Sequence, residues 1–216
     1  MPNFRIARLA VVGVALVGAL GACGGDDSGE AEATTTTADL GAPLEAAVLT
    51  PEDLASDDPL DAAWVVGDVS AGVDIELPAC VLEEPPAGAL ASAEARLVTQ
   101  NDLKLPSLEE DVSVFEGSGA ADAFAAAGER LDSCDPTFVF GGTPSVGAID
   151  RLALTLPGEQ SAAWRTTVTI AGTGVAITNI HIQDGDHELA LTHVDLGEPN
   201  PAVLEGYATL ALSKLG

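Results

Sequence analysis

Residues 175–195, VAITNIHIQDGDHELALTHVD in one-letter code, decide the fold of this chain. Apolar and polar side chains alternate on both sides of Asp184-Gly185, which is the pattern of a β-strand with one buried face. An Asp-Gly pair between two such runs is the strongest short-range signal for a β-hairpin. We therefore predict two antiparallel strands, at residues 175–183 and 186–195, joined by a two-residue turn at Asp184-Gly185.

The same alternation occurs earlier in the chain, and turn residues such as Pro157-Gly158-Glu159 separate the alternating segments. We predict further strands at residues 93–100, 111–116, 137–140, 148–156 and 163–171. Together with the hairpin, these strands form an antiparallel sheet that ends in a meander.

Two helices accompany the strands. A helix at residues 119–133, with Ser118 as its N-cap, places its apolar residues on one face. A closing helix begins with Asn200 as N-cap and Pro201 as first residue, and a shorter helix follows Thr50 in the same way. This order of elements predicts an α+β fold, in which a central helix and a C-terminal helix pack on the antiparallel meander.

The first 22 residues have the layout of a signal peptide. Arg5 and Arg8 precede an uncharged run at residues 9–20, shorter than the roughly 20 apolar residues that a membrane-spanning helix needs. The run ends in Leu20-Gly21-Ala22-Cys23, which resembles a bacterial lipobox and implies that Cys23 carries diacylglycerol. Two acyl chains give stable membrane anchoring. The alternative is an ordinary secretory signal followed by a stray cysteine, and either signal exports the chain.

A polar segment follows the acylation site. Residues 23–43 are rich in Gly, Asp, Glu, Ala and Thr, and include four consecutive threonines at 34–37. Such a composition cannot bury enough apolar surface to offset the entropy of ordering the chain. We expect a disordered acidic tether here, followed by a single folded domain at residues 44–216.

The charge of the chain excludes several classes of function. Lys and Arg number 8 against 34 Asp and Glu, for a net charge of −26. This field repels phosphate groups, so we expect no nucleic-acid partner, and contact with the membrane has to come from the acyl chains on Cys23. The glycine-rich stretches carry no lysine for a phosphate cradle, and no serine lies in a nucleophile elbow. We expect no enzymatic activity and no cofactor.

Cys80 and Cys134 are the two cysteines of the folded part. An even pair of cysteines in an oxidising compartment indicates a disulfide. The alternative is a metal-binding or catalytic thiol, but the acidic neighbours Asp132 and Asp135 disfavour a reactive thiolate at Cys134. We predict a disulfide between Cys80 and Cys134.

The hairpin also carries all three histidines. With the predicted turn, His181 faces Glu188 across the two strands and shares its side with Asp186. One histidine with two carboxylates could hold a divalent metal. Other polar residues share this face, so we favour a solvent-exposed His–Glu pair and expect no metal. His187 and His193 fall on the opposite, apolar side, as edge positions of the core.

Several features together resemble a known family. They are the acylated tether, the segment LTPEDL at 49–54, a helix with AADAFAA at 120–126 that closes at Cys134, the meander and an alanine-rich terminal helix. The set resembles the extracellular sensor domain of the mycobacterial kinase PknH and its stand-alone lipoprotein relatives, over most of residues 44–216. The resemblance implies a non-enzymatic sensor or ligand-binding domain on the extracytoplasmic face of an actinobacterial cell membrane. Its partner would be a small ligand or an envelope protein.

A sheet that two helices cover incompletely leaves a cleft, which the few aromatic side chains are able to line. The candidates are Trp64, Phe138, Phe140, Trp164 and Tyr207. The alternative, which we favour, is that these aromatics fill the core. Two other functions stay open. A lipid carrier would need a large apolar cavity, and an envelope hydrolase would use acids such as Asp186 and Glu188.

Overall fold

The structure is a computed structural model of the chain. It describes residues 37–54, 63–67, 75–76, 80–81, 86–101, 104–140, 143–170 and 172–216. These residues all belong to one compact unit, Thr35–Gly216. The predicted signal peptide and the acylation site at Cys23 lie outside the described residues. None of the helices in the described part is both long enough and apolar enough to cross a membrane.

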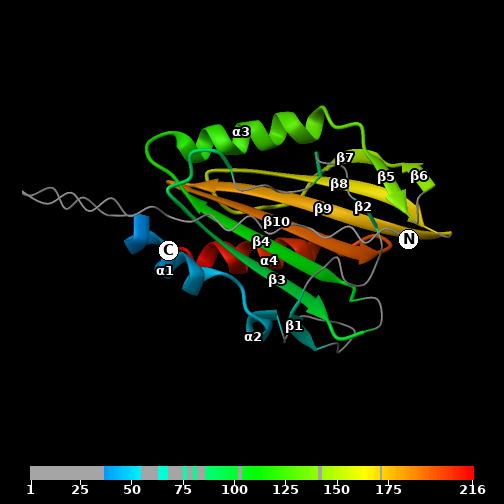
Figure 1. Cartoon of the computed structure of the whole chain (residues 1–216), viewed down its shortest axis with the longest axis horizontal. Helices are drawn as coiled ribbons and strands as arrows, with labels where there is room; N and C mark the ends of the chain where they lie inside the picture. Colours follow the sequence, from blue (N-terminus) through cyan, green and yellow to red (C-terminus); the bar gives the residue numbers. More distant parts are fainter. Residues whose placement is uncertain are drawn as a thin grey trace, which may run out of the picture. The chain divides into compact units, whose positions relative to one another are not determined.

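Seven strands form the main sheet, in the order β1-β3-β4-β10-β9-β8-β7, and each neighbouring pair is antiparallel (Figure 1). A smaller sheet has the order β2-β5-β6. The predicted α+β fold with an antiparallel meander is confirmed. In chain order the elements are α1 (Thr37–Ala47), α2 (Pro51–Leu54), β1 (Trp64–Val66), β2 (Ile75–Glu76), β3 (Ala91–Thr99), β4 (Ser107–Val114), α3 (Gly119–Asp132), β5 (Thr137–Phe140), β6 (Thr143–Val146), β7 (Ala148–Leu152), β8 (Gln160–Ile170), β9 (Thr173–Asp184), β10 (His187–Leu196) and α4 (Pro201–Ser213).

β9 and β10 form the predicted hairpin, but the turn is shifted by one residue. Asp184 pairs with His187, so Gly185 and Asp186 are the two turn residues. Gly185 has φ +58°, a conformation that glycine adopts without steric cost and that two-residue hairpin turns require. The predicted turn at Asp184-Gly185 was therefore wrong by one position.

The shift changes the partner of His181. His181 lies opposite Ala190, and Glu188 lies opposite Gln183. Residues directly opposite each other share a face of the sheet, so Glu188 stays on the same side as His181, two pairs nearer to the turn.

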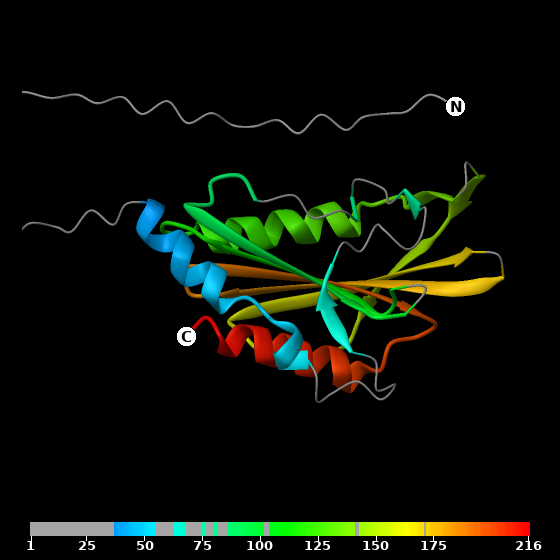
Figure 2. The ribbon, with the colours of Figure 1, turned by 60° about the horizontal axis from the view of Figure 1, so that its bottom comes forward.

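Helices cover both faces of the main sheet (Figure 2). α3 packs on β8, β9 and β10 on one side, which we call the α3 face. α4 covers the other side together with α1, which packs along β3, and we call this the α4 face. Side chains alternate between the two faces along each strand. In β9, His181 points to the α3 face, whereas Ile180 and Ile182 point to the α4 face.

The α4 face holds the larger apolar core. Trp64 and Tyr207 belong to this core, with ring centroids 6.3 Å apart in an edge-to-face arrangement. Its other buried members include Leu44, Leu49, Leu54, Leu97, Leu108, Val112, Ile180, Ile182, Leu189, Leu191, Leu204, Ala208 and Ala211.

The α3 face holds a smaller apolar core near the end of α3. A disulfide joins Cys80 and Cys134 beside it, with the two Cα atoms 5.7 Å apart, and this is the pairing predicted from the sequence. The disulfide links the residue before Val81 to the segment that leaves α3. The buried members are Val81, Leu105, Val168, Val175, Ile177 and Val194.

The predicted N-cap of α4 is confirmed, and at α2 the acid three residues after Thr50 reaches back to it. Asn200 Oδ1 accepts a hydrogen bond of 3.0 Å from the backbone N–H two residues later, at the start of α4. At the start of α2, one Asp53 carboxylate oxygen accepts from the backbone N–H and the hydroxyl of Thr50, at 2.8 and 2.9 Å. Ser118 does not cap α3 through its side chain as predicted, because its hydroxyl donates to the Asp122 carboxylate instead (3.1 Å).

The folded part begins earlier than the sequence indicated. α1 starts at Thr37, inside the segment 23–43 that was expected to be a disordered tether. Leu40 and Leu44, one helical turn apart, pack on the α4-face core, and Leu44 is 5% exposed. These two leucines order the helix, but they are too few to change the overall composition of the segment, from which disorder was predicted.

Candidate functional site

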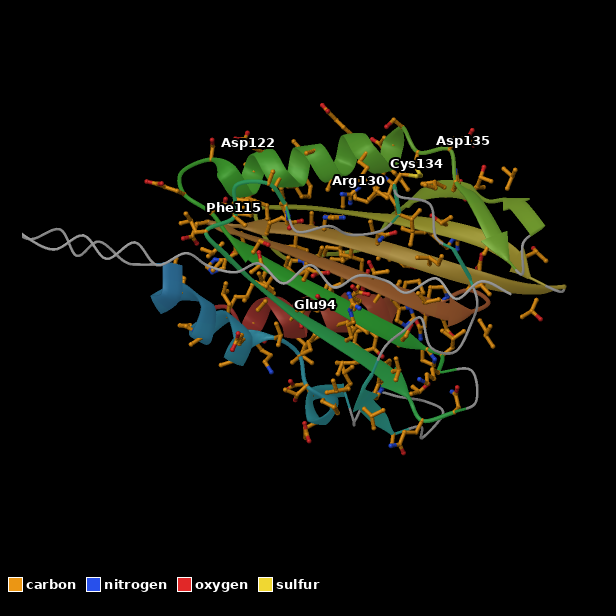
Figure 3. The ribbon with its side chains drawn as sticks, viewed as in Figure 1. Glu94, Phe115, Asp122, Arg130, Cys134 and Asp135 are labelled. Carbon is orange, nitrogen blue, oxygen red and sulfur yellow. A yellow bond between two sulfur atoms is a disulfide. The ribbon has the colours of Figure 1, made fainter. Side chains whose placement is uncertain are left out.

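A cavity of about 520 Å³ lies on the α3 face, between α3, the end of the β9–β10 hairpin and the loop that precedes β3. Figure 3 labels Phe115 and Asp122 near the start of α3 and Arg130 near its end. The lining residues are Pro86, Ala87, Gly88, Phe115, Gly119, Asp122, Ala123, Ala126, Ala127, Arg130, His181 and Glu188.

α3 turns one side to this cavity. The helix residues that line it, from Gly119 to Arg130, follow one another at steps of three and one, which places them on one side of a helix with 3.6 residues per turn. The middle of this side consists of Ala123, Ala126 and Ala127. Larger apolar residues at these positions would fill the space against the hairpin, so the cavity follows from the alanine-rich centre of α3.

Backbone contacts fix the end of the cavity at which α3 begins. The N–H of Phe115 donates to the carbonyl of Asp186 (2.9 Å), which ties the approach to α3 to the hairpin turn. A Cβ atom at position 119 would come within 2.8 Å of the Phe115 Cβ, so Gly119 permits this close approach. The N–H of Leu90 donates to the carbonyl of Val114 (2.8 Å) and holds the loop on the other side of the cavity.

His181 and Glu188 lie where the cavity meets the sheet. His181 Nδ1 lies 2.8 Å from Glu188 Oε1, and the two side chains are 1% and 4% exposed. The prediction that these two residues form a solvent-exposed pair was wrong, because α3 covers this face of the hairpin. A buried carboxylate loses its hydration, and the hydrogen bond from histidine replaces part of it.

The hydrogen bond uses one of the two carboxylate oxygens of Glu188. Within the part of the chain that the structure describes, His181 is the hydrogen-bond partner of Glu188. The other oxygen, Oε2, belongs to a side chain that lines the cavity. A carboxylate oxygen can accept hydrogen bonds only, so this atom is suited to a donor group.

Trp164 stands behind His181 and is fixed from the other side. The two rings meet edge to face, with centroids 5.9 Å apart. The indole N–H donates to Asp132 (2.7 Å), and the Arg151 guanidinium lies 5.1 Å from the centre of the Trp164 ring. Arg151 also pairs with Asp132, and its hydrogen bond, followed by that of Trp164, lowers the pKa of this carboxyl. These contacts hold Trp164 in place behind His181, next to the cavity.

The α4 face carries two buried ionisable groups of its own. Glu110 Oε2 accepts a hydrogen bond of 2.6 Å from the backbone N–H of Leu49, and burial raises the pKa of Glu110 to about 7. Burial lowers the pKa of His193 to about 4, and its ring lies 5.9 Å from that of Tyr207. Neither Glu110 nor His193 lines the described cavity. His193 lies on the apolar face of the hairpin, where the alternation placed it.

Glu110 was missed because the predicted strand began at residue 111, whereas β4 begins at Ser107. In the observed register, Leu108, Glu110 and Val112 share a face. An acidic residue between two apolar ones at period two was the signal that would have found this buried carboxylate.

The aromatic residues predicted to line a cleft do not line this cavity. Trp64 and Tyr207 are buried in the α4-face core, and Trp164 is buried behind His181, so for these three the alternative of core packing describes the structure. Phe138 and Phe140 belong to β5, and their side chains lie outside what the structure describes.

Metal ligands do not gather in the described part of the chain. No group of three or more His, Cys, Asp and Glu residues there is arranged to hold a metal ion. Asp186, the third ligand considered from the sequence, lies in the hairpin turn with its side chain 59% exposed. Its carboxylate bonds to His187 Nδ1 at 2.8 Å rather than facing His181.

Comparisons with known proteins concern the fold as a whole. No protein-family model matches the chain, and no curated protein matches it. Among solved structures, the extracellular domain of PknH from Mycobacterium tuberculosis is similar, with a TM-score of 0.60 and 10% sequence identity. The match covers 81% of this chain and 93% of that chain. A likeness at this identity shows the fold and transfers no residue roles. The resemblance noted in the sequence is thus confirmed, and the chain has the fold of the PknH extracellular domain.

Proposed function

We propose that this chain is a non-enzymatic, acylated envelope protein whose extracytoplasmic domain binds a small ligand in the cavity under α3. The observation that carries the proposal is a cavity of about 520 Å³ with a buried His181–Glu188 pair at the sheet. Ligand sites are concave and combine apolar surface with a few placed polar groups, and this cavity combines alanine, proline and phenylalanine side chains with four polar ones. The likeness to an extracellular domain supports a location outside the cytoplasm.

The positions of Asp186 and Glu188 do not fit the hydrolase considered from the sequence. A hydrolase that uses two carboxylates needs both of them beside the bond that breaks. Glu188 lines the cavity, whereas Asp186 is exposed in the hairpin turn and paired with His187. The pair of acids considered from the sequence therefore does not share one site.

A lipid carrier is favoured less than a carrier or sensor of a polar compound. An acyl chain in this cavity would lie against the Glu188 carboxylate without offering it a hydrogen bond. Burying a polar group against hydrocarbon without a partner costs about 1–3 kcal/mol in proteins. A ligand with its own polar group avoids this cost.

Ligand binding is tested with the exported chain carrying Cys23→Ser, which leaves it without an acyl anchor. Native mass spectra are recorded before and after unfolding. We expect a bound mass that is lost on unfolding, and that is absent from Ala126→Trp, in which the indole fills the cavity. Ala125→Trp is the control, because Ala125 is exposed on the same helix and does not line the cavity. A bound mass that persists in Ala126→Trp contradicts this location.

Anchoring is tested separately on the parent chain from its own membrane fraction. We expect the N-terminal peptide of the mature protein to begin at Cys23 and to carry diacylglycerol. A peptide that begins elsewhere, or an unmodified Cys23, contradicts the anchor while leaving the binding domain untouched.

A further inference from the structure

We propose that the cavity under α3 takes a ligand with a protonated amino group, which donates a hydrogen bond to Glu188, and an apolar body that packs on Phe115 and α3. This inference rests on the proposed function and adds the chemical class of the ligand. The acceptor in the cavity, the charges around it and the apolar wall support it.

The acceptor is the second carboxylate oxygen of Glu188. His181 occupies Oε1, and this bond requires only the neutral histidine tautomer with its proton on Nδ1. The negative charge of the carboxylate then remains for another donor. An ammonium group gains Coulomb attraction to the carboxylate in addition to the hydrogen bond, whereas a hydroxyl gains the hydrogen bond alone. An ammonium group is therefore favoured over a hydroxyl at this atom.

The charges along the cavity also favour an ammonium group near Glu188. Glu188 and Asp122 both belong to the end where α3 begins, which the bond between Phe115 and Asp186 joins to the hairpin turn. Arg130 follows Asp122 by eight positions, which is about 12 Å along the helix at 1.5 Å per residue. The helix position that carries the positive side chain is therefore about two turns away from Asp122.

One effect opposes a cation at this end. The start of a helix carries about half a positive charge from its dipole, which falls off within the first turn. The carboxylate of Glu188 carries a whole negative charge, and Asp122 lies in the first turn of α3 with a second one. The carboxylates therefore outweigh the helix dipole. The net charge of −26 also raises the local concentration of cations relative to anions.

The remaining wall selects an apolar body. Phe115 and the alanines at 123, 126 and 127 offer hydrocarbon surface, and Pro86 and Ala87 face them from the loop. An aromatic or branched aliphatic group buries apolar area there, at about 25 cal/mol per Å². Three probes share one ring and differ in the head group: 2-phenylethylamine, 2-phenylethanol and 3-phenylpropionate.

Binding is read from the fluorescence of Trp164, which contacts His181, in the Cys23→Ser chain that also carries Trp64→Phe. We expect 2-phenylethylamine to bind at least tenfold more tightly than the alcohol and the carboxylate. Glu188→Gln removes this preference and weakens the amine by at least tenfold. Glu129→Gln is the control, because it deletes the same charge at an exposed position of α3 outside the cavity and leaves the affinity unchanged.

Asp122→Asn provides a second variant, because Asp122 is exposed and its loss does not endanger the fold. We expect it to weaken the amine by about threefold, as for an exposed charge pair. Amine binding that Glu188→Gln and Asp122→Asn both leave unchanged overturns the assignment. Tighter binding of the alcohol or the carboxylate also overturns it and leaves the proposed function intact. Absence of binding by all three probes overturns the amine class, and the proposed function is then decided by the native mass spectra.

Discussion

Two buried glutamates, Glu188 on the α3 face and Glu110 on the α4 face, show how differently the two sides of one sheet are built. They belong to neighbouring strands and are 3% and 1% exposed. Glu188 has a histidine partner and a cavity beside it. Among the described residues, the partner of Glu110 is the backbone N–H of Leu49, inside the apolar packing. One carboxylate borders a cavity, and the other is enclosed by the core.

Enclosure has a direct effect on ionisation. Burial raises the pKa of Glu110 to about 7, and the charge of Asp53 adds to this rise. The hydrogen bond from Leu49 and the charge of Lys214 act in the opposite direction and are outweighed. The α4 face therefore contains a group whose charge destabilises the fold near neutral pH, and the described structure opens no path by which a ligand would relieve it.

His193 is the counterpart of Glu110 on the same face. Burial lowers its pKa to about 4, so the folded state favours the neutral imidazole where Glu110 favours the neutral acid. The α4 face thus disfavours charge of either sign. This is the behaviour of a packed core, and it contrasts with the mixed charges of the α3 face.

The largest expected effect comes from opening the α3 face at its disulfide. Replacing both cysteines, Cys80→Ser with Cys134→Ser, releases a loop of sequence separation 54. Chain-entropy reasoning predicts a loss of about 4 kcal/mol in the free energy of unfolding. Urea unfolding at pH 7 measures it, and the parent protein in reducing agent should match the variant. Equal stability of the oxidised parent and the variant would show that the disulfide does not constrain this face.

The next effect is a gain in stability at Glu110. Between its ordinary pKa of 4.5 and about 7, the folded state holds a proton that the unfolded state has lost. The stability contribution is thus present below pH 4.5 and is lost as the pH rises through about 7. We expect Glu110→Gln to raise the free energy of unfolding at pH 8 by up to about 3 kcal/mol, and to change it little at pH 4.5.

Urea unfolding of the parent and Glu110→Gln at the two pH values isolates this contribution from that of the other acids. Glu52→Gln is the control, because Glu52 is exposed in α2 and its replacement should stay within about 0.5 kcal/mol. A variant that is less stable than the parent at pH 8 would mean that the Leu49 hydrogen bond outweighs the burial of the charge.

His193 should make the free energy of unfolding depend on pH with the sign opposite to that of Glu110. Its pKa falls from 6.5 to about 4, so below pH 6.5 the unfolded state binds a proton that the folded state does not. The contribution is present above pH 6.5 and is lost as the pH falls through about 4. Relative to the parent, His193→Asn should therefore lose about 2 kcal/mol less between pH 7 and pH 5.

His187→Asn is the matched control for this measurement, because His187 lies on the same strand with its side chain 27% exposed. If the free energies of unfolding of His193→Asn and of the parent change by the same amount between pH 7 and pH 5, this result would contradict a buried neutral histidine. Combining Glu110→Gln with His193→Asn should flatten both slopes of the free energy of unfolding against pH, because burial disfavours the charged form of each group.

Local patterns in the sequence predicted the elements that depend on neighbours along the chain. The alternation at 175–195 gave the long hairpin, and Asn200-Pro201 marked the start of α4. The turn was placed one residue early because Asp184-Gly185 and Gly185-Asp186 have the same turn chemistry. The choice between them depends on pairing along the whole hairpin, which a dipeptide does not contain.

A cleft was predicted from the incomplete cover of the sheet by helices, but the position and lining of the cavity depend on contacts between distant segments and were not predicted. The cavity exists because alanines at 123, 126 and 127 face the hairpin, which requires knowing that α3 lies over β9 and β10. The same knowledge turns His181 and Glu188 from a solvent-exposed pair into a buried one. The short strands β1 and β2 likewise depend on partners far away in sequence.

The smallest expected effect compares the two helices directly, through one glycine in each. A Cβ atom at Gly128 of α3 would meet the Trp164 ring at 3.8 Å, an ordinary contact, and a Cβ atom at Gly206 of α4 would meet nothing within 4 Å. Alanine is favoured over glycine in a helix interior by about 0.5–1 kcal/mol. We expect Gly206→Ala to gain this amount, and Gly128→Ala to gain a few tenths of a kcal/mol more through its contact with Trp164.

Urea unfolding of the two variants measures the difference, and the fluorescence titration with 2-phenylethylamine shows whether the cavity has changed. Gly128 adjoins the lining residue Ala127 but does not itself line the cavity, so affinity should stay within about twofold. A gain at Gly206 with a loss at Gly128 would mean that α3 is packed on Trp164 too tightly to accept a methyl group. Tight packing on Trp164 would then hold α3 in place next to the cavity, and a ligand would bind without moving the helix.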